Sequence, residues 1–311
     1  MASPFFIKKL TFLKLTDQPA VGSMELESLL DKKAHRVMGS MEQEMCMWQP
    51  PAGLKSKTLL HESQGQRLML MEKHKRRLSG ALVKEEVNKE VHRLEQESGA
   101  LLSRKAKSAV KERIRDSLMP KAPISVSRVY VWWDVDAEML ALSTVSQKEI
   151  DQVLALLSET VGGVTHHTIN TQENPEQMMT NWLLDEATRP MWLKLGDSTV
   201  LIGAEKARYS GNNVNLEGDE IGVMLQQGYR VAEMAVEMPS HASFTLTGRL
   251  QLKKISFAPE VAEEVDSEAH DDEVSAFEAS FFIMADSLRW ITTQVIEASG
   301  GIEPSDDSFK E

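Results

Sequence analysis

The chain has 311 residues, a length that suits one large domain or two to three small ones. Hydrophobic residues make up 41% and charged residues 26%, which excludes an intrinsically disordered chain. The sequence contains no run of about 20 uncharged apolar residues, so a transmembrane helix is excluded, and the lysines within 5–15 argue against a signal peptide. A single cysteine, Cys46, excludes an intramolecular disulfide and a cysteine-based zinc site. We therefore expect a cytoplasmic protein that does not enter the membrane.

The net charge of −12 conceals a strong asymmetry between the two halves of the chain. Residues 1–128 hold 24 Lys and Arg against 15 Asp and Glu, whereas residues 129–311 hold 11 against 32. Such a split is typical of a protein with a basic surface for a polyanion and an acidic remainder. The alternative is that the acidic and basic segments pair with each other, and charge alone does not separate the two.

The first 128 residues contain apolar runs typical of strands and one long charged stretch typical of helix. The pattern predicts strands over 5–15 and 66–72 and a helix over 24–35. Residues 83–118 have leucine, alanine and valine at helical spacing, which predicts one long helix or two helices joined near Gly99. Prolines at positions 120 and 123 end this segment.

The remaining residues predict short strands, mostly in hairpins, with helices between them. Residues 128–144 form the clearest hairpin, followed by a helix over 146–161 that begins with a Ser146/Glu149 capping box. The later predicted elements are a strand over 164–170, a helix over 175–184, a hairpin over 191–202 around Gly196-Asp197, a helix over 218–228, antiparallel strands over 230–238 and 243–257, an acidic linker over 260–273 and an amphipathic helix over 274–298.

These elements predict an α+β fold, with antiparallel sheets built from hairpins, a long charged helical segment and a C-terminal amphipathic helix. We expect four regions along the chain. They are an N-terminal α/β part over 1–75, a charged helical region over 76–125, an antiparallel α+β region over 126–259, and an acidic linker with the C-terminal helix over 260–311.

The sequence shows no motif for a catalytic or cofactor site. It lacks a phosphate-binding loop and a dinucleotide fingerprint, and we expect neither cofactor nor enzymatic activity. Asp134 and Asp136 lie two apart on a predicted strand and could hold Mg²⁺, so a divergent nuclease remains the alternative. His166 and His167 are adjacent on a strand and point to opposite faces, which argues against joint metal chelation.

A stripe of basic residues on the second half of the charged segment is the strongest functional signal. Arg104, Lys107, Lys111 and Arg115 fall within a band of about 80° and about 16 Å on one helix face. That length can follow several phosphates of a duplex. Further candidates for DNA contact are Lys75, Arg76, Arg77, Lys121, Arg128, Lys253 and Lys254. The alternatives are a solvated helix face, or a basic helix that binds an acidic protein partner such as the 260–273 segment.

Several motifs, in order, resemble those of the bacterial RdgC family. The chain has Met47-Trp48-Gln49-Pro50-Pro51, then Leu118-Met119-Pro120-Lys121-Ala122 directly after the charged helix. Leu252-Lys253-Lys254-Ile255 before Phe257 is similar to a family strand, and the Gly300-Gly301 end is similar to that of its C-terminal helix. The chain departs from the family at Pro123, where members often carry an aromatic residue in a finger that helps to close a ring.

The resemblance implies a ring-shaped homodimer whose basic central hole takes double-stranded DNA without sequence specificity. It also implies a nucleoid-associated protein that restrains recombination promoted by RecA. The basic helix and the elbow at positions 120–123 would then lie near the hole or near a dimer contact.

Overall fold

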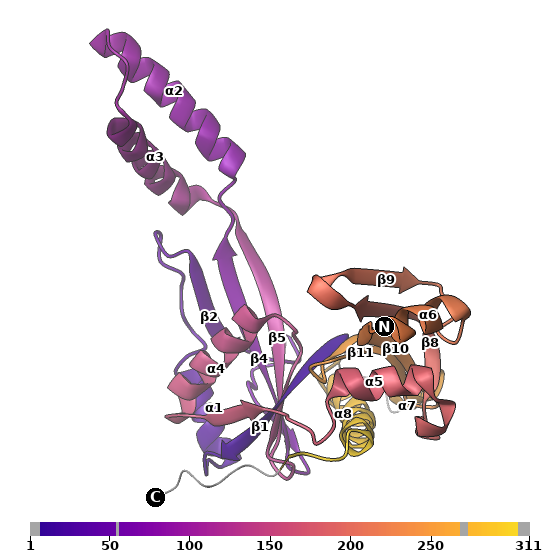
Figure 1. Cartoon of the computed structure of the whole chain (residues 1–311). Helices are drawn as coiled ribbons and strands as arrows, with labels where there is room; N and C mark the ends of the chain where they lie inside the picture. The colour runs from indigo at the N-terminus through magenta and orange to yellow at the C-terminus, as the bar shows by residue number, and fades with distance from the viewer. Residues whose placement is uncertain (1–6, 54–55, 268–272, 304–311) are drawn as a thin grey trace, which may run out of the picture.

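The computed structural model describes residues 7–53, 56–267 and 273–303. It consists of an N-terminal lobe, a helical hairpin that projects from this lobe, and a C-terminal lobe (Figure 1). The N-terminal lobe contains β1 (Lys9–Asp17), α1 (Ser23–Asp31), β2 (Glu44–Gln49), β3 (His61–Ser63), β4 (Gln66–Arg76), β5 (Ile124–Asp134), β6 (Met139–Leu142), α4 (Gln147–Val161) and β7 (Thr165–Thr168).

The hairpin consists of α2 (Gly80–Ser98) and α3 (Arg104–Leu118), and the short 3₁₀ helix η1 (Met119–Lys121) follows it. The C-terminal lobe contains α5 (Pro175–Leu184), η2 (Glu186–Thr188), β8 (Lys194–Ile202), η3 (Ala204–Lys206), β9 (Arg208–Asn212), α6 (Asp219–Gln226), β10 (Arg230–Met238), β11 (Ala242–Thr247), β12 (Leu252–Phe257), α7 (Pro259–Ser267) and α8 (Glu273–Ala298).

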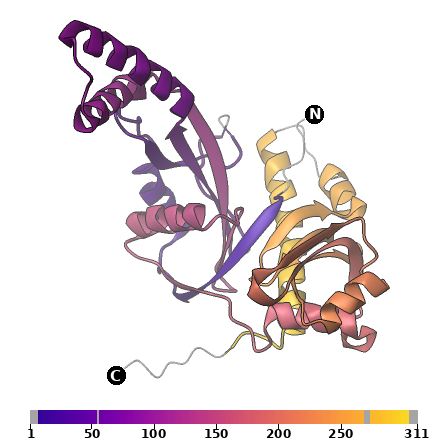
Figure 2. The same ribbon diagram turned by 45° about the horizontal axis from the view of Figure 1, so that its top comes forward.

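One twelve-stranded antiparallel sheet runs through both lobes in the order β2-β4-β5-β6-β1-β12-β11-β10-β8-β9, with β3 on β4 and β7 on β1. Strand β1 joins the lobes, since it pairs with β6 on one edge and with β12 only at Lys9 and Leu10. Figures 1 and 2 show β1 crossing from one lobe to the other. The fold is α+β with antiparallel pairing, as predicted.

The sheet of the N-terminal lobe is covered on both faces. Met69 of β4 and Trp133 of β5 belong to a core with α1 and α4, whereas Leu68 and Trp132 face the core that contains α8. Each of these side chains is at most 1% exposed, and burying one such side chain contributes about 1.5–3 kcal/mol. Trp48 of the proline-rich motif is also buried, and its indole N–H donates to Thr160 of α4 at 2.8 Å. The motif therefore anchors β2 beneath α4.

Helix α8 belongs to the C-terminal lobe but also covers the N-terminal sheet, so it joins the two lobes (Figure 1). Polar contacts at 2.6, 3.3 and 2.7 Å connect it to β3, β4 and β5; they are His61–Glu278, Gln66–Asp286 and Asp134–Arg289. The amphipathic helix predicted at the end of the chain is thus confirmed, and it acts as the joint between the lobes.

Most predicted elements are confirmed, and the charged segment is two helices separated at Gly99, whose φ is 66°. The hairpin predicted over 191–202 is wrong, because this segment is the single strand β8, which pairs with β9 and β10. Gly196 serves a close approach instead of a turn, since a Cβ there would lie 2.6 Å from the Cβ of Ala235.

Three further predictions are corrected. The strand predicted over 243–257 is two strands, β11 and β12, which pair antiparallel with each other. The segment 260–273 is not a linker throughout, because 259–267 form α7; residues 268–272 lie outside the described part of the chain. The Ser146/Glu149 capping box is also wrong, since the Ser146 hydroxyl caps nothing. Instead the Thr144 hydroxyl accepts from the Ser146 N–H at 3.1 Å and bonds to the Glu149 carboxylate.

Candidate nucleic-acid interface

The helical hairpin is built by local signals in the sequence. Ser79 and Ser103 cap the two helices, since their hydroxyls accept from the N–H groups of Leu82 and Ala106. Gly99 takes the left-handed conformation that ends α2. The helices pack through few buried residues, which are Val83, Val91 and Val110. The hairpin thus presents mostly polar surface, away from the two cores (Figures 1 and 2).

Two basic residues of α3 are neutralised by α2. Lys107 lies 3.0 Å from Glu95, and Arg113 forms an ion pair with Glu90. The Leu102 N–H and the Lys107 ammonium bond to the Glu95 carboxylate and hold its pKa below the usual range. These two cations flank the face of α3 that packs on α2, which explains their pairing. Of the predicted stripe, Lys107 is therefore already matched by an acidic partner.

The other three stripe residues remain available to a polyanion. Arg104, Lys111 and Arg115 are exposed, and none of them forms an ion pair within the part of the chain that the structure describes. At 100° per residue they fall within about 40° of one another on α3 and span about 16 Å. Lys105, which the sequence reasoning omitted, is likewise exposed on this helix. Ala109 of the same helix is exposed as well.

The basic residues at the base of the hairpin divide into structural and exposed groups. The Arg76 guanidinium donates to the carbonyls of Pro120, Ala122 and Gly39 at 3.2–3.4 Å, so it holds the elbow of the hairpin. Arg77 donates to the Ser125 hydroxyl at 2.9 Å, and its backbone N–H donates to the carbonyl of Pro123. Lys121 is exposed beside them.

Lys75 and Arg128 lie on β4 and β5, where each has a carboxylate partner. Lys75 bonds to Glu44 at 2.8 Å, and Arg128 bonds to Glu72 at 2.9 Å. Burial raises the pKa of Glu72, but hydrogen bonds from His74 and Arg128 outweigh it and the pKa is lowered. Their contribution to a basic surface is therefore smaller than their number indicates.

Glu44 is an ionic centre that the sequence did not reveal. Its carboxylate lies 2.8 Å from both Lys148 and Lys75 and 3.8 Å from Lys73. Hydrogen bonds from Lys148 and Lys75 lower its pKa to about 2. The predicted elements omitted β2, so nothing placed Glu44 beside β4 and α4; the short apolar run from Met45 to Trp48 was the available signal.

Lys253 and Lys254 lie on β12 in the C-terminal lobe, not on the hairpin. Lys253 forms an ion pair with Glu233 at 3.0 Å, whereas Lys254 is exposed. The structure thus does not bring these lysines together with the stripe into one cluster.

The carboxylates of the nuclease alternative are engaged differently. Asp134 is 1% exposed, accepts from Arg289 at 2.7 Å, and caps the turn by accepting from the Ala137 N–H at 3.0 Å. Asp136 is exposed in that turn. Across residues 7–53, 56–267 and 273–303, no group of three His, Cys, Asp or Glu residues is placed to hold a metal ion. Both contacts of Asp134 are structural ones.

No described helix is long and apolar enough to cross a membrane. The family model described as "Putative exonuclease, RdgC" matches residues 5–302. The chain is 29% identical over 306 residues to the recombination-associated protein RdgC of Actinobacillus pleuropneumoniae serotype 3, covering 96% of this chain and 99% of that protein. It is 27% identical to the RdgC of Serratia proteamaculans, covering 95% and 98%, and 28% identical to that of Aeromonas hydrophila, covering 96% and 99%.

The match extends through both lobes and the hairpin, including the proline-rich motif at β2, the elbow after α3 and the strand β12. The chain belongs to the RdgC family.

Proposed function

We propose that this protein is a non-catalytic, nucleoid-associated protein that binds double-stranded DNA without sequence specificity. The observation that carries the proposal is the exposed row of Arg104, Lys111 and Arg115 on a projecting helix. Cations arranged along about 16 Å of one helix face can each contact a backbone phosphate of a duplex. Contacts to phosphates do not distinguish one base sequence from another. The relatives named recombination-associated proteins support a role in that process.

The pairing on the hairpin sharpens the proposal. Glu95 and Glu90 pair with Lys107 and Arg113, the cations of α3 next to α2. Of the four exposed cations of α3 that form no ion pair with a described residue, three lie in one line, namely Arg104, Lys111 and Arg115. An acidic protein partner is the alternative, and the salt dependence of DNA binding separates the two.

Fluorescence anisotropy of a labelled duplex, titrated from about 50 to 200 mM salt, tests the stripe. We expect the logarithm of the association constant to fall steeply with that of the salt concentration. Replacing Arg104, Lys111 and Arg115 by alanine should reduce the slope by about 0.9 for each phosphate that is no longer neutralised. The matched control removes three cations from α2 instead, at Lys84, Lys89 and Arg93, and should change the slope less. Equal slopes for the wild type and the stripe variant would refute the assignment.

We further propose that two copies close as a ring around the duplex, and that this ring restrains recombination promoted by RecA. The resemblance of the motifs and the projecting hairpin support this arrangement. A closed ring stays linked to circular DNA at high salt and slides off once the DNA is cut. The mass of the protein in solution tests whether two copies associate. Retention of the protein on circular and on linearised plasmid at high salt tests whether the dimer closes around DNA. Equal loss from both forms would contradict a ring.

A strand-exchange assay with RecA tests the proposed role in recombination. The wild type should slow exchange, and the stripe variant should slow it less because it occupies less DNA. Mg²⁺-dependent degradation of DNA by the purified protein would instead favour the nuclease alternative.

A further inference from the structure

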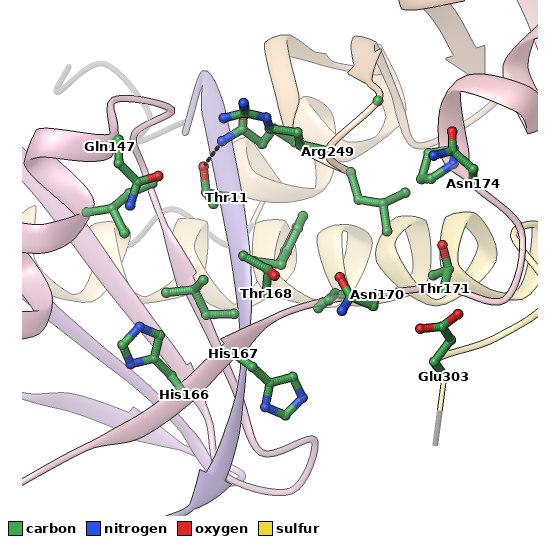
Figure 3. A pocket seen from close by; sticks show the side chains of 18 of the residues that line it. Thr11, Gln147, His166, His167, Thr168, Asn170, Thr171, Asn174, Arg249 and Glu303 are labelled. Carbon is green, nitrogen blue, oxygen red and sulfur yellow. Dashed lines mark hydrogen bonds between the residues drawn. The ribbon is translucent and has the colours of Figure 1, made fainter. Parts of the chain in front are cut away.

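A pocket of about 640 Å³ opens where β1 changes its neighbour in the sheet (Figure 3). Leu10 of β1 lies opposite Leu252 of β12, whereas Leu13 lies opposite Thr168 of β7. Between these positions, Thr11 and Phe12 of β1 pair with neither β12 nor β7, and both residues line the pocket. Crevices at domain junctions, and at points of a sheet where neighbouring strands diverge, are common ligand sites.

The walls of the pocket are rich in carboxamides. They come from three segments, namely the start of α4, residues 170–174 and the turn before β12, and are Gln147, Asn170, Gln172, Asn174 and Gln251. The Gln251 Nε2 donates to the Thr11 hydroxyl at 3.0 Å, and the Gln147 Nε2 donates to Asp151 at 2.8 Å. These bonds fix the two side chains by their donor ends, and no described residue donates to their Oε1 atoms. Carboxamides offer both donors and acceptors, as base edges require.

The charged groups at the pocket favour an anion. Arg249 is exposed in the turn between β11 and β12 and forms no ion pair with any described residue. His166 and His167 also line the pocket, but as neighbours on β7 they point to opposite faces of the sheet, and the His167 ring is held by the Thr16 hydroxyl at 2.9 Å. Glu303 is the one carboxylate among the lining residues (Figure 3). The guanidinium of Arg249 is suited to phosphate.

Apolar side chains complete the lining, among them Phe12, Ile169 and Leu250. The volume lies within the roughly 300–1,000 Å³ of small-molecule sites, and a bare phosphate would fill only a small part of it. The ligand that fits thus combines a phosphate, an edge of donors and acceptors, and an apolar face.

We propose that this pocket binds a nucleotide bearing a phosphate, with the phosphate on Arg249 and the base edge on the carboxamides. The same chemistry is offered by a free mononucleotide and by the phosphorylated end of a DNA strand. The segments that line the pocket, on β1, α4, β7 and the turn between β11 and β12, lie near the junction of the lobes and away from α2 and α3 (Figure 1). The pocket is therefore separate from the DNA-binding stripe and goes beyond the proposed function.

Calorimetric titration of the full chain with deoxyadenosine monophosphate tests the pocket, with inorganic phosphate and deoxyadenosine as separate probes. We expect saturable binding of the nucleotide, tighter than that of either fragment. Arg249→Ala should weaken it about tenfold or more through the loss of a charge-assisted contact. The control Arg208→Ala removes an exposed arginine from β9 and should leave the affinity unchanged.

Magnetic resonance of the histidine rings locates the ligand, since binding in the pocket should shift the signals of His166 and His167. A 5′-phosphorylated single strand is then tested as a competitor of the nucleotide in the stripe variant. Displacement of the nucleotide assigns the pocket to a strand end, and lack of displacement assigns it to a free nucleotide. Because the stripe variant lacks the three cations of α3, any binding of the strand in this test is independent of whether the stripe binds DNA. Absence of saturable binding, equal affinity for inorganic phosphate, or an unchanged affinity in Arg249→Ala would overturn the proposal.

Discussion

Replacing Asp134 by alanine should destabilise the fold, because this carboxylate holds α8 against the N-terminal sheet. The side chain of Asp134 is 2% exposed, and that of its partner Arg289 is 36% exposed. Breaking a buried ion pair costs about 3–5 kcal/mol. Arg289 can recover part of its hydration, which reduces the loss to about 2–3 kcal/mol, and the lost bond to the Ala137 N–H adds about 1 kcal/mol. We expect a total of about 3–4 kcal/mol.

Urea denaturation, followed by both tryptophan fluorescence and far-ultraviolet circular dichroism, measures this effect. With a slope of about 3 kcal/mol per molar, the midpoint should fall by roughly 1 M. The control Asp136→Ala removes the exposed carboxylate of the same turn and should change the stability by no more than about 0.5 kcal/mol. Trp132 lies on the same face of the sheet and makes fluorescence a local reporter.

A double variant identifies the cause of the loss. If the unpaired guanidinium carries most of the cost, Asp134→Ala with Arg289→Met should be more stable than the sum of the two single effects predicts. Strict additivity, or a stability of Asp134→Ala within about 0.5 kcal/mol of the wild type, would refute the reasoning. A catalytic carboxylate would behave differently, since its removal would abolish DNA degradation without this loss of stability.

Three further predictions concern charge and backbone conformation. The pKa of Glu44 is lowered from 4.5 to about 2 in the folded protein, so its carboxylate should stabilise the fold above pH 4.5 by about 1–2 kcal/mol after solvent screening. In urea titrations at pH 7, Glu44→Gln should lose this stabilisation. The difference in stability between the variant and the wild type should shrink as the pH falls towards 2. Glu95→Gln should free Lys107 for phosphate and steepen the salt dependence of DNA binding by up to about 0.9 per protomer; an unchanged slope would show that Lys107 faces away from DNA. Gly65→Ala should lower the stability of the fold by about 1–2 kcal/mol in thermal melts, because the φ of Gly65 is +74°. The control Gly222→Ala lies within α6, where a Cβ meets open space, and should leave the melting temperature unchanged or raise it.

The elements of the chain could largely be predicted because their signals are local. Helix periodicity placed the two helices of the charged segment, and a β-prone run placed the strands around 128–144. The errors have a common cause. Gly196 indicates a turn in the sequence, but it accommodates Ala235 of a neighbouring strand, and β2 becomes recognisable only beside β4.

The candidate interface shows the same division between local and tertiary determinants. The sequence by itself determined that Arg104, Lys107, Lys111 and Arg115 share one helix face, because 3.6 residues per turn fixes their angles. Only the packing of α2 on α3 decided that Lys107 is paired with Glu95, since a partner 12 residues away is chosen by the fold of the hairpin.

Tertiary structure likewise decided the role of Asp134. In the sequence it lies two residues from another aspartate, which is the pattern of a metal site. In the fold its partner is Arg289, 155 residues further along the chain, because α8 returns to cover the first lobe. Spacing along the chain determines which residues share a face, but the chemistry of a buried carboxylate depends on the element packed against it.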